Sequence, residues 1–380
     1  MKNNRTFLEK LLDGAEVEWK PLNKIVTTIT APVKLKREMY CSTGSTPIID
    51  QGEKFIAGYT DENFEAIPSN EYIIFGDHSE HIKYVNFSFI QGADGLKILK
   101  PKEDNAKYIY YAFQNFYVKE LNYKRHWSSA KETLIPLPPP TVQTEIVRIL
   151  DALTAFTSEL TSELTLRRKQ YEYYREKLLS EEELIKLGAT TENLGDITSI
   201  TSGGTPSTKE PAYWVEGNIP WIKSESCKNK LIDEIKHHIT EMGLQNSNAK
   251  LLSPNTTLMA MVGATIFKTA FLPFEATTNQ NIAAIKSKNE LSITDKFIFY
   301  YLTNMYDFFI SKLSGYNMVN LSQIKNIKIL LPPLEEQQRI VSILDKFEAL
   351  TNSITEGLPL AIEQSQKRYE YYRELLLNFS

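Results

Sequence analysis

Two stretches of the chain carry apolar residues at the three- and four-residue spacing of a long amphipathic helix. They occupy residues 138–189 and 332–380, and each begins at a run of prolines, which ends the preceding segment and favours the first turn of a helix. Forty helical residues extend over roughly 60 Å. Each helix has one apolar stripe that needs a partner, and the other long helix is the nearest candidate. The pattern therefore predicts two long helices that pack against each other.

The two predicted helices differ in two places. The first contains the tandem sequence TSEL-TSEL at 157–164, and each four-residue unit adds roughly 6 Å of helix and about 40° of rotation. The repeat is either ordinary helical filling or a device that sets the length of the helix. Its candidate spacer residues are Thr157, Leu160, Thr161 and Leu164. The second helix contains Gly357 and Pro359, which predict a kink or a broken turn.

An internal repeat organises the chain. LPPPTVQTEIVRILD at 137–151 returns as LPPLEEQQRIVSILD at 331–345, and YEYYRE at 171–176 returns unchanged at 369–374. The sequence EKLL, which closes the first repeat at 176–179, is also present at 9–12. The chain thus begins where a repeat unit ends. We therefore expect a cyclic two-fold arrangement of the two repeats that is interrupted where the chain begins and ends.

The segments outside the two helices, about 18–137 and 190–331, show strand-like and helical patterns in the same order. Short apolar, often β-branched runs are typical of strands, and they occur at 72–75, 95–99, 257–262 and 281–285. An aromatic-rich helical stretch follows in each segment, at 108–113 and 297–302. We predict an α+β protein in which two mixed α/β domains share one scaffold. Its divisions are residues 1–137 (with a short N-terminal helix), 138–189, 190–331 and 332–380.

Charge is distributed unevenly along the chain. The 43 basic and 47 acidic residues exclude binding of a polyanion through bulk basicity. The two predicted helices carry 12 basic and 17 acidic residues, so the domains can still present positive faces. The densest basic cluster interleaves cations with aromatic residues: Lys119, Lys124, Arg125 and Lys131 with Tyr123, His126 and Trp127.

Several classes of chemistry have no motif in the sequence. It has no apolar run long enough for a bilayer, no secretory signal and only two distant cysteines, which fits a cytoplasmic protein. It has neither a P-loop nor a GxGxxG motif after a strand. The best metal candidate is the pair His78 and His81, but a third ligand cannot be located, so hydrogen-bonding or surface roles are favoured.

The motifs give the chain a resemblance to the specificity subunits of bacterial type I restriction-modification systems. The two LPP–ILD–YEYYRE segments carry it, together with IIDQG at 48–52, AGYTDEN at 57–63, IFGDH at 74–78, QGAD at 91–94, SGGTPS at 202–207, IPWI at 219–222 and NQN at 279–281. The match covers essentially the whole chain. The TSEL units resemble the subgroup with tandem TxEL repeats in the first conserved helix, whereas Gly357-Leu358-Pro359 departs from the symmetry of the repeats.

The resemblance implies a pseudo-two-fold fold with two target-recognition domains separated by an antiparallel coiled coil. Each domain would read one half of a split, asymmetric sequence in double-stranded DNA. The helices would set the unread spacer and dock two methyltransferase subunits, which the restriction motor-nuclease subunits would join. The chain itself would be non-catalytic and hold no cofactor or metal, because S-adenosylmethionine, ATP and magnesium would belong to the partner subunits.

Base edges are read by polar side chains, and phosphates are bound largely by cations. We therefore select polar, basic and aromatic loop residues as DNA-binding candidates. In the first domain they are Lys83, Tyr84, Lys124, Arg125, His126, Trp127 and Ser128, and in the second Thr205, Ser207, Thr208, Lys209, Lys223, Ser224, Tyr316 and Asn317. Trp214 and Trp221 are predicted to anchor the core instead.

The YEYYRE motifs offer both packing and docking residues. The apolar stripe of the first helix runs through Phe156, Tyr171 and Tyr174, which predicts helix packing for them. Positions off the stripe are the better candidates for docking a partner subunit. They are Tyr173, Arg175, Tyr371 and Arg373.

Two other functions compete with the DNA reader. A coiled-coil scaffold could bind proteins at both ends without reading DNA, and a stand-alone DNA-modifying enzyme is disfavoured by the missing cofactor motifs. A salt titration separates the first two, because a DNA reader loses affinity steeply with salt and prefers one split sequence.

Overall fold

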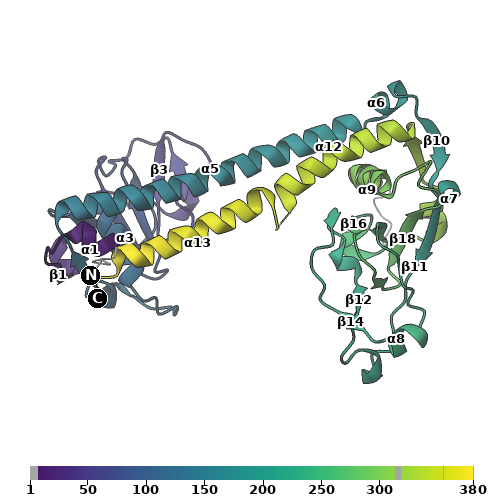
Figure 1. Cartoon of the computed structure of the whole chain (residues 1–380). Coiled ribbons are helices and arrows are strands. Elements are labelled where there is room, and N and C mark those ends of the chain that lie inside the picture. The colour runs from purple at the N-terminus through teal and green to yellow at the C-terminus, as the bar shows by residue number, and fades with distance from the viewer. Residues whose placement is uncertain (1–6, 313–317, 354, 380) are drawn as a thin grey trace. The chain divides into compact units, whose positions relative to one another are not determined.

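The computed structural model describes residues 7–312, 318–353 and 355–379 (Figure 1). The chain divides into two compact units, Met1–Thr161 with Ala361–Ser380, and Ser162–Leu360. Each unit therefore combines one globular domain with the parts of the long helices next to it. The boundary between the units falls inside the long helices and not at their ends.

The long helices form as the periodicity predicts. Helix α5 (Pro140–Leu178) is continuous and runs through both units, while the C-terminal helical segment is divided into α12 (Leu334–Asn352) and α13 (Gly357–Leu377) (Figure 1). The predicted break at Gly357 is confirmed. Its φ of +77° suits glycine, and a Cβ there would lie 2.5 Å from the carbonyl oxygen of Ala349.

Within each unit the helices pack in antiparallel order. In the first unit, Ile146 near the start of α5 shares a core with Leu376 near the end of α13. In the second unit, Tyr174 near the end of α5 stacks on Phe347 of α12, with ring centres 5.5 Å apart. Phe156 departs from the expected stripe and is 48% exposed, because α5 meets α13 at this level through hydroxyl groups.

The first domain contains three sheets and a helix that covers the largest sheet. The four-stranded sheet has the order β2 (Val26–Ile29), β8 (Leu96–Pro101), β5 (Tyr72–Gly76), β6 (Ile82–Val85). A three-stranded sheet has the order β4 (Gly58–Thr60), β3 (Thr46–Ile49), β7 (Ile90–Gln91), and β1 (Glu18–Pro21) pairs with β9 (Leu134–Leu137). The helical elements are α1 (Phe7–Leu12), α2 (Leu22–Ile25), α3 (Ala106–Phe116) and α4 (Trp127–Ala130), with a 3-10 turn at Arg37–Met39.

The second domain repeats this plan and adds one strand. Its large sheet has the order β11 (Thr198–Ser202), β18 (Ile282–Ser287), β15 (Thr256–Ala260), β16 (Thr269–Leu272), β13 (Lys230–Leu231). The smaller sheets are β14 (His238–Ile239), β12 (Ile219–Ile222), β17 (Thr277–Thr278), and the pair β10 (Thr190–Asn193) with β19 (Lys328–Leu331). The helices are α6 (Glu181–Lys186), α7 (Leu194–Ile197), α8 (Glu241–Gln245), α9 (Asp295–Asn304), α10 (Tyr306–Lys312) and α11 (Leu321–Lys325), with 3-10 turns at Pro211–Tyr213, Ser224–Ser226 and Gly263–Thr265.

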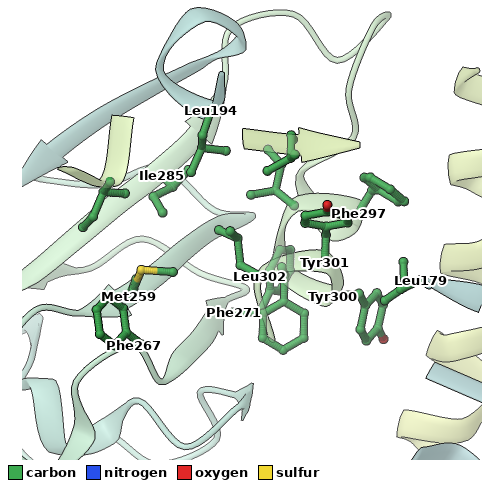
Figure 2. Close-up of a cluster of buried hydrophobic side chains, with 14 of the residues drawn as sticks. Leu179, Leu194, Met259, Phe267, Phe271, Ile285, Phe297, Tyr300, Tyr301 and Leu302 are labelled. Carbon is green, nitrogen blue, oxygen red and sulfur yellow. The ribbon is translucent and has the colours of Figure 1, made fainter. Parts of the chain in front are cut away.

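The aromatic helices predicted from the sequence form the centres of the cores. In the second unit, Phe297, Tyr300 and Tyr301 of α9 pack against sheet residues such as Phe271 (Figure 2). Leu179, which follows α5, joins the same cluster (Figure 2). Burial of each such side chain stabilises the fold by about 1.5–3 kcal/mol. The domain and the adjoining helices thus share one core within the unit.

Candidate nucleic-acid interface

An exposed basic loop, residues 118–125, follows α3 in the first domain. It carries Lys119, Lys124 and Arg125, and its Tyr123 is 91% exposed. Lys124 forms an ion pair with Glu120 of the same loop. The loop combines exposed cations with an exposed aromatic ring, the side-chain chemistry that contacts phosphates and bases.

A buried carboxylate holds the basic loop in place. Glu80, in the turn between β5 and β6, accepts hydrogen bonds from the hydroxyl of Tyr117 (2.6 Å) and the backbone amides of Glu120 (2.8 Å) and Leu121 (2.9 Å). Burial alone would raise the pKa of Glu80, but these hydrogen bonds outweigh burial and lower its pKa. Glu80 therefore remains a carboxylate that fixes the start of the loop.

The same turn fixes the end of the loop. The carbonyl oxygen of Asp77 accepts the backbone amide of His126 (2.8 Å), and the Asp77 carboxylate accepts that of Trp127 (2.8 Å). His78 stacks on Tyr123 with ring centres 5.3 Å apart, and its Nδ1 lies 3.0 Å from the carbonyl oxygen of Lys124. The His78–His81 turn, considered above for a metal, thus supports the loop. Among the described residues, no group of three His, Cys, Asp or Glu side chains could hold a metal ion.

The predicted DNA-binding residues of the first domain separate into exposed and buried sets. Lys124, Arg125 and Ser128 are exposed, and Trp127 is half-buried against Phe75. His126 is fully buried, with its Nε2 2.8 Å from the carbonyl oxygen of Asn122.

Lys83 is also buried, and its ammonium group donates to the carbonyl oxygens of Asp50 (2.9 Å) and Lys54 (2.5 Å). Tyr84 is half-buried and donates to Glu71. Neither Lys83 nor His126 is available to a duplex in this structure, so both leave the candidate set. Exposed Lys119 and Tyr123 join it, and both belong to the basic cluster visible in the sequence.

The second domain presents a cleft beside the end of β11. Gly203 and Gly204 line it, and a Cβ on Gly204 would lie 2.4 Å from the backbone of Asn248. Thr205 donates to Gln280 (2.5 Å) at its rim, and Lys250 contributes a cation. Sequence reasoning missed the polar residues that arrive from distant segments: Asn248, Lys250 and Gln280.

The other predicted residues of the second domain do not line this cleft, and two of them lie outside the described residues. Ser207, Thr208 and Lys209 are exposed, whereas Lys223 and Ser224 are half-buried after β12. Tyr316 and Asn317 lie outside the described residues. The anchoring role of the tryptophans is confirmed, because Trp221 is 5% exposed and packs edge-on against Trp214.

The YEYYRE motifs present similar faces in the two units. Tyr173 and Tyr371 are 57% and 62% exposed, as the docking prediction requires. The guanidinium groups of the half-buried Arg175 and Arg373 lie over neighbouring tyrosine rings, at 5.6 and 5.8 Å. Each of these two arginines has an Nε without a hydrogen-bond partner.

The TSEL residues lie on α5, and Thr157 contacts α13. The hydroxyl of Thr157 is 2.8 Å from that of Ser365 on α13, and Thr161 donates to the carbonyl oxygen of Thr157 (2.8 Å). Leu160 and Leu164 are half-buried. The spacer role and the TxEL subgroup stay predictions.

Each domain is joined to its long helix by the same set of hydrogen bonds. Gln143 and Gln337 are buried and accept the backbone amides of Asn105 and Thr294, both at 3.0 Å. Their side-chain amides donate to the carbonyl oxygens of Pro138 and Pro332.

About two helical turns further along, an aspartate completes each junction. Asp151 accepts from Lys107 (2.6 Å) and Tyr111 (2.7 Å), and Asp345 accepts from Lys296 (2.8 Å) and Tyr300 (2.5 Å). Burial and the adjacent carboxylate raise the pKa of both tyrosines, so their hydroxyls stay protonated donors. The junction thus uses equivalent residues in both units, although Gln143 also donates to the Asp104 carboxylate and Gln337 to the carbonyl oxygen of Ser292.

The comparisons with known proteins agree on one family. A family described as the type I restriction modification DNA specificity domain matches residues 16–167 and 188–364. The specificity subunit of the Escherichia coli type I restriction enzyme EcoR124I/EcoR124II is 38% identical over 399 aligned residues, covering 98% of this chain and 97% of that protein. A putative type I restriction enzyme specificity subunit of Haemophilus influenzae is 38% identical over 404 residues and covers 100% of both chains.

The fold has the same relatives. The crystal structure of a type I restriction-modification S subunit from M. genitalium matches with a TM-score of 0.62 at 15% identity, covering 97% of this chain and 98% of that one. No helix in the described part of the chain is long and apolar enough to cross a membrane. The chain therefore belongs to the type I restriction-modification DNA specificity subunits, the non-catalytic subunits of these systems.

Proposed function

We propose that this specificity subunit reads a split, asymmetric duplex sequence, one half with each recognition domain. The observation that carries the proposal is a repeated frame with different surfaces. The two domains share strand order and the Gln–Asp junction, yet one presents a basic loop and the other a cleft of threonine, lysine and glutamine. Two unlike readers on one frame suit a bipartite site whose halves differ.

The exposed residues suggest how the contacts divide. In the basic loop, Lys119, Lys124 and Arg125 would bind phosphates, with Tyr123 against the duplex. In the cleft, Gln280 and Asn248 carry amides that suit hydrogen bonding to adenine edges, and Lys250 suits guanine or phosphate.

The long helices would set the unread spacer and dock two methyltransferase subunits, with the restriction subunits joining that core. The exposed Tyr173 and Tyr371 support a repeated docking face, because the same side chain is presented once in each unit. S-adenosylmethionine, ATP and magnesium would be held by the partners. We place the complex in the cytoplasm, where the bacterial duplex lies.

The direct test is methylation-sensitive sequencing of the host genome with and without this gene. We expect one bipartite motif to lose methylation when the gene is deleted and to regain it on complementation. An unchanged methylome, with the partner subunits expressed, would contradict the proposal.

A second test uses the chain in complex with its methyltransferase subunits. Arg125→Ala should lower the slope of log affinity against log salt by about 0.9 if Arg125 binds one phosphate. The matched control is Lys186→Ala, which removes an exposed cation of α6 that already pairs with Glu182. Affinity that ignores both salt and DNA sequence would favour the protein-interaction scaffold instead.

A further inference from the structure

The large sheets of the two domains end differently. In the first domain the sheet stops at β6, whereas in the second it continues from β16 to the short parallel strand β13. The extra strand comes from the segment between β12 and β14, residues 223–237, while the corresponding segment of the first domain is only residues 50–57.

Strands β6 and β16 are equivalent, residue by residue. The register of β5 with β8 and of β15 with β18 aligns Ile74 with Leu258. Lys83 of β6 pairs with Ile74, and Ala270 of β16 pairs with Leu258. Lys83 is therefore equivalent to Ala270, and Tyr84 to Phe271. The same cation contact marks both positions, with Lys107 5.4 Å from the Tyr84 ring centre and Lys296 4.9 Å from that of Phe271.

In the second domain the segment around β13 satisfies the edge of β16. The backbone amide of Asn229 donates to the carbonyl oxygen of Thr269 (2.7 Å), and that of Ile232 donates to the carbonyl oxygen of Phe271 (2.9 Å). The amide of Thr269 in turn donates to the Asn229 side chain (2.9 Å). The edge is thus covered from within the chain.

In the first domain the same edge is open. The amide of Gly76 donates to the carbonyl oxygen of His81, and paired residues alternate along an antiparallel ladder. The backbone amide and carbonyl of Lys83 therefore point toward β5. The backbone amides and carbonyls of Ile82 and Tyr84 point outward, away from the sheet. No strand in the described ranges pairs with this side of β6. A lysine on an edge strand can prevent another strand from pairing there. The Lys83 side chain does not do so, because its ammonium group donates to two loop carbonyl oxygens.

A groove of about 1300 Å³ runs beside the open edge, within the first unit. Its walls include Tyr110 of α3, Thr154 of α5 and Tyr369 of α13. Two of its cations, Lys119 and Arg373, have no carboxylate partner among the described residues, and Arg373 belongs to the predicted docking face. The carboxylates of Glu53 and Glu370 line the groove as well. The groove therefore joins an unpaired strand edge to the helices on which a partner is expected.

We propose that an extended segment of a methyltransferase subunit adds to β6 as a parallel strand, in the place that β13 holds in the second domain. The added strand would donate to the carbonyl oxygens of Ile82 and Tyr84 and accept from the amide of Tyr84, as β13 and its flanking residues do for β16. A carboxylate of the segment would meet Lys119 or Arg373. This inference rests on the proposed function, because it presupposes assembly with methyltransferase subunits.

Hydrogen exchange of the full chain, alone and assembled with the methyltransferase subunit, tests the strand directly. Within the peptide covering residues 82–85, the outward amide of Tyr84 should exchange at least about a hundredfold more slowly in the complex, whereas residues 269–272 are protected in both states. Equal exchange of 82–85 in an assembled complex overturns the inference but leaves the proposed function intact. Failure of the two subunits to assemble overturns both.

A pair of variants tests the same contact by affinity. Tyr84→Pro removes the outward amide, which an edge strand tolerates, and Tyr84→Ala removes the side chain but keeps the amide. We expect the proline variant to bind the methyltransferase subunit about three- to tenfold more weakly than the alanine variant. Equal affinity of two folded variants would contradict strand addition, and the exchange experiment decides the matter if the proline variant does not fold.

Discussion

The two recognition domains share one backbone contact and differ in the side chains around it. In the first domain, the amide of His126 donates to the carbonyl oxygen of Asp77, and in the second the amide of Val319 donates to that of Met261. Asp77 and Met261 directly follow the equivalent strands β5 and β15. His126 and Val319 are both buried, so the histidine occupies the position of a core aliphatic residue.

The difference lies in what surrounds this shared contact. The first domain adds the buried carboxylates of Asp77 and Glu80, which receive four hydrogen bonds from the loop and its flanks. The second adds a further pairing between Val262 and Met318. The comparison teaches that the backbone frame is common, while each reading surface has its own support. A substitution in one support should therefore affect one half-site.

The largest expected effect comes from shortening the long helix α5, which adjoins both domains. Deletion of Thr161–Leu164 shortens α5 by roughly 6 Å, close to two base pairs of a duplex at 3.4 Å each. We expect methylation of the native site to be lost and a site with a shorter spacer to be used, with both half-sites unchanged. Sequencing of modified bases in cells that carry the deletion measures both properties, and an unchanged spacer in an assembled complex would contradict the spacer role.

Glu80→Ala should break the support of the first domain alone. It leaves three donors without their charged acceptor, and a loss of about 3 kcal/mol in unfolding free energy follows from about 1.5–3 kcal/mol per hydrogen bond to a charge, partly offset by relaxation and water. Denaturant unfolding of the purified complex gives the stability, and binding to duplexes with one altered half-site gives the specificity. Discrimination at one half-site should fall while the other is retained; equal loss at both would show that the supports are not independent.

Local sequence patterns were sufficient to predict the long helices. Contacts between residues far apart in the sequence determine which predicted site residues are exposed. Periodicity and proline runs gave the long helices, and Gly357 gave their interruption, because helix formation and termination depend on residues a few positions apart. The two-residue strand β13 has no local signature and exists only through its pairing with β16. Lys83 and His126 were selected for their charge and position, but backbone carbonyls near in space hold both inside the domain.

The duplicated junction provides a matched pair of smaller effects. Asp151→Asn and Asp345→Asn each remove the charge that pairs with a lysine while keeping an acceptor for the tyrosine hydroxyl. Because all four charged side chains are partly exposed, we expect about 1 kcal/mol from each substitution. Unfolding of each single variant and of the double variant measures this, with Glu363→Gln on the exposed face of α13 as a control. Clearly unequal effects would show that the junctions differ in energy despite their common geometry.

The smallest effect is a pH dependence specific to the first domain. The folded pKa of Glu80 is lowered, so its stabilising contribution is present above the ordinary glutamate pKa of about 4.3 and is lost as the pH falls through the lower, folded value. Denaturant unfolding of the wild type and of Glu80→Ala should therefore differ by a constant amount from neutral pH down to about pH 5, and the difference should shrink below pH 4. Because Glu80 makes its hydrogen bonds only to the first domain, exchange of amides 118–125 should rise over the same acid range while amides 269–272 stay protected. A difference between the two proteins that persists unchanged into strong acid would mean that the Glu80 side chain supports the loop by packing and not as a carboxylate.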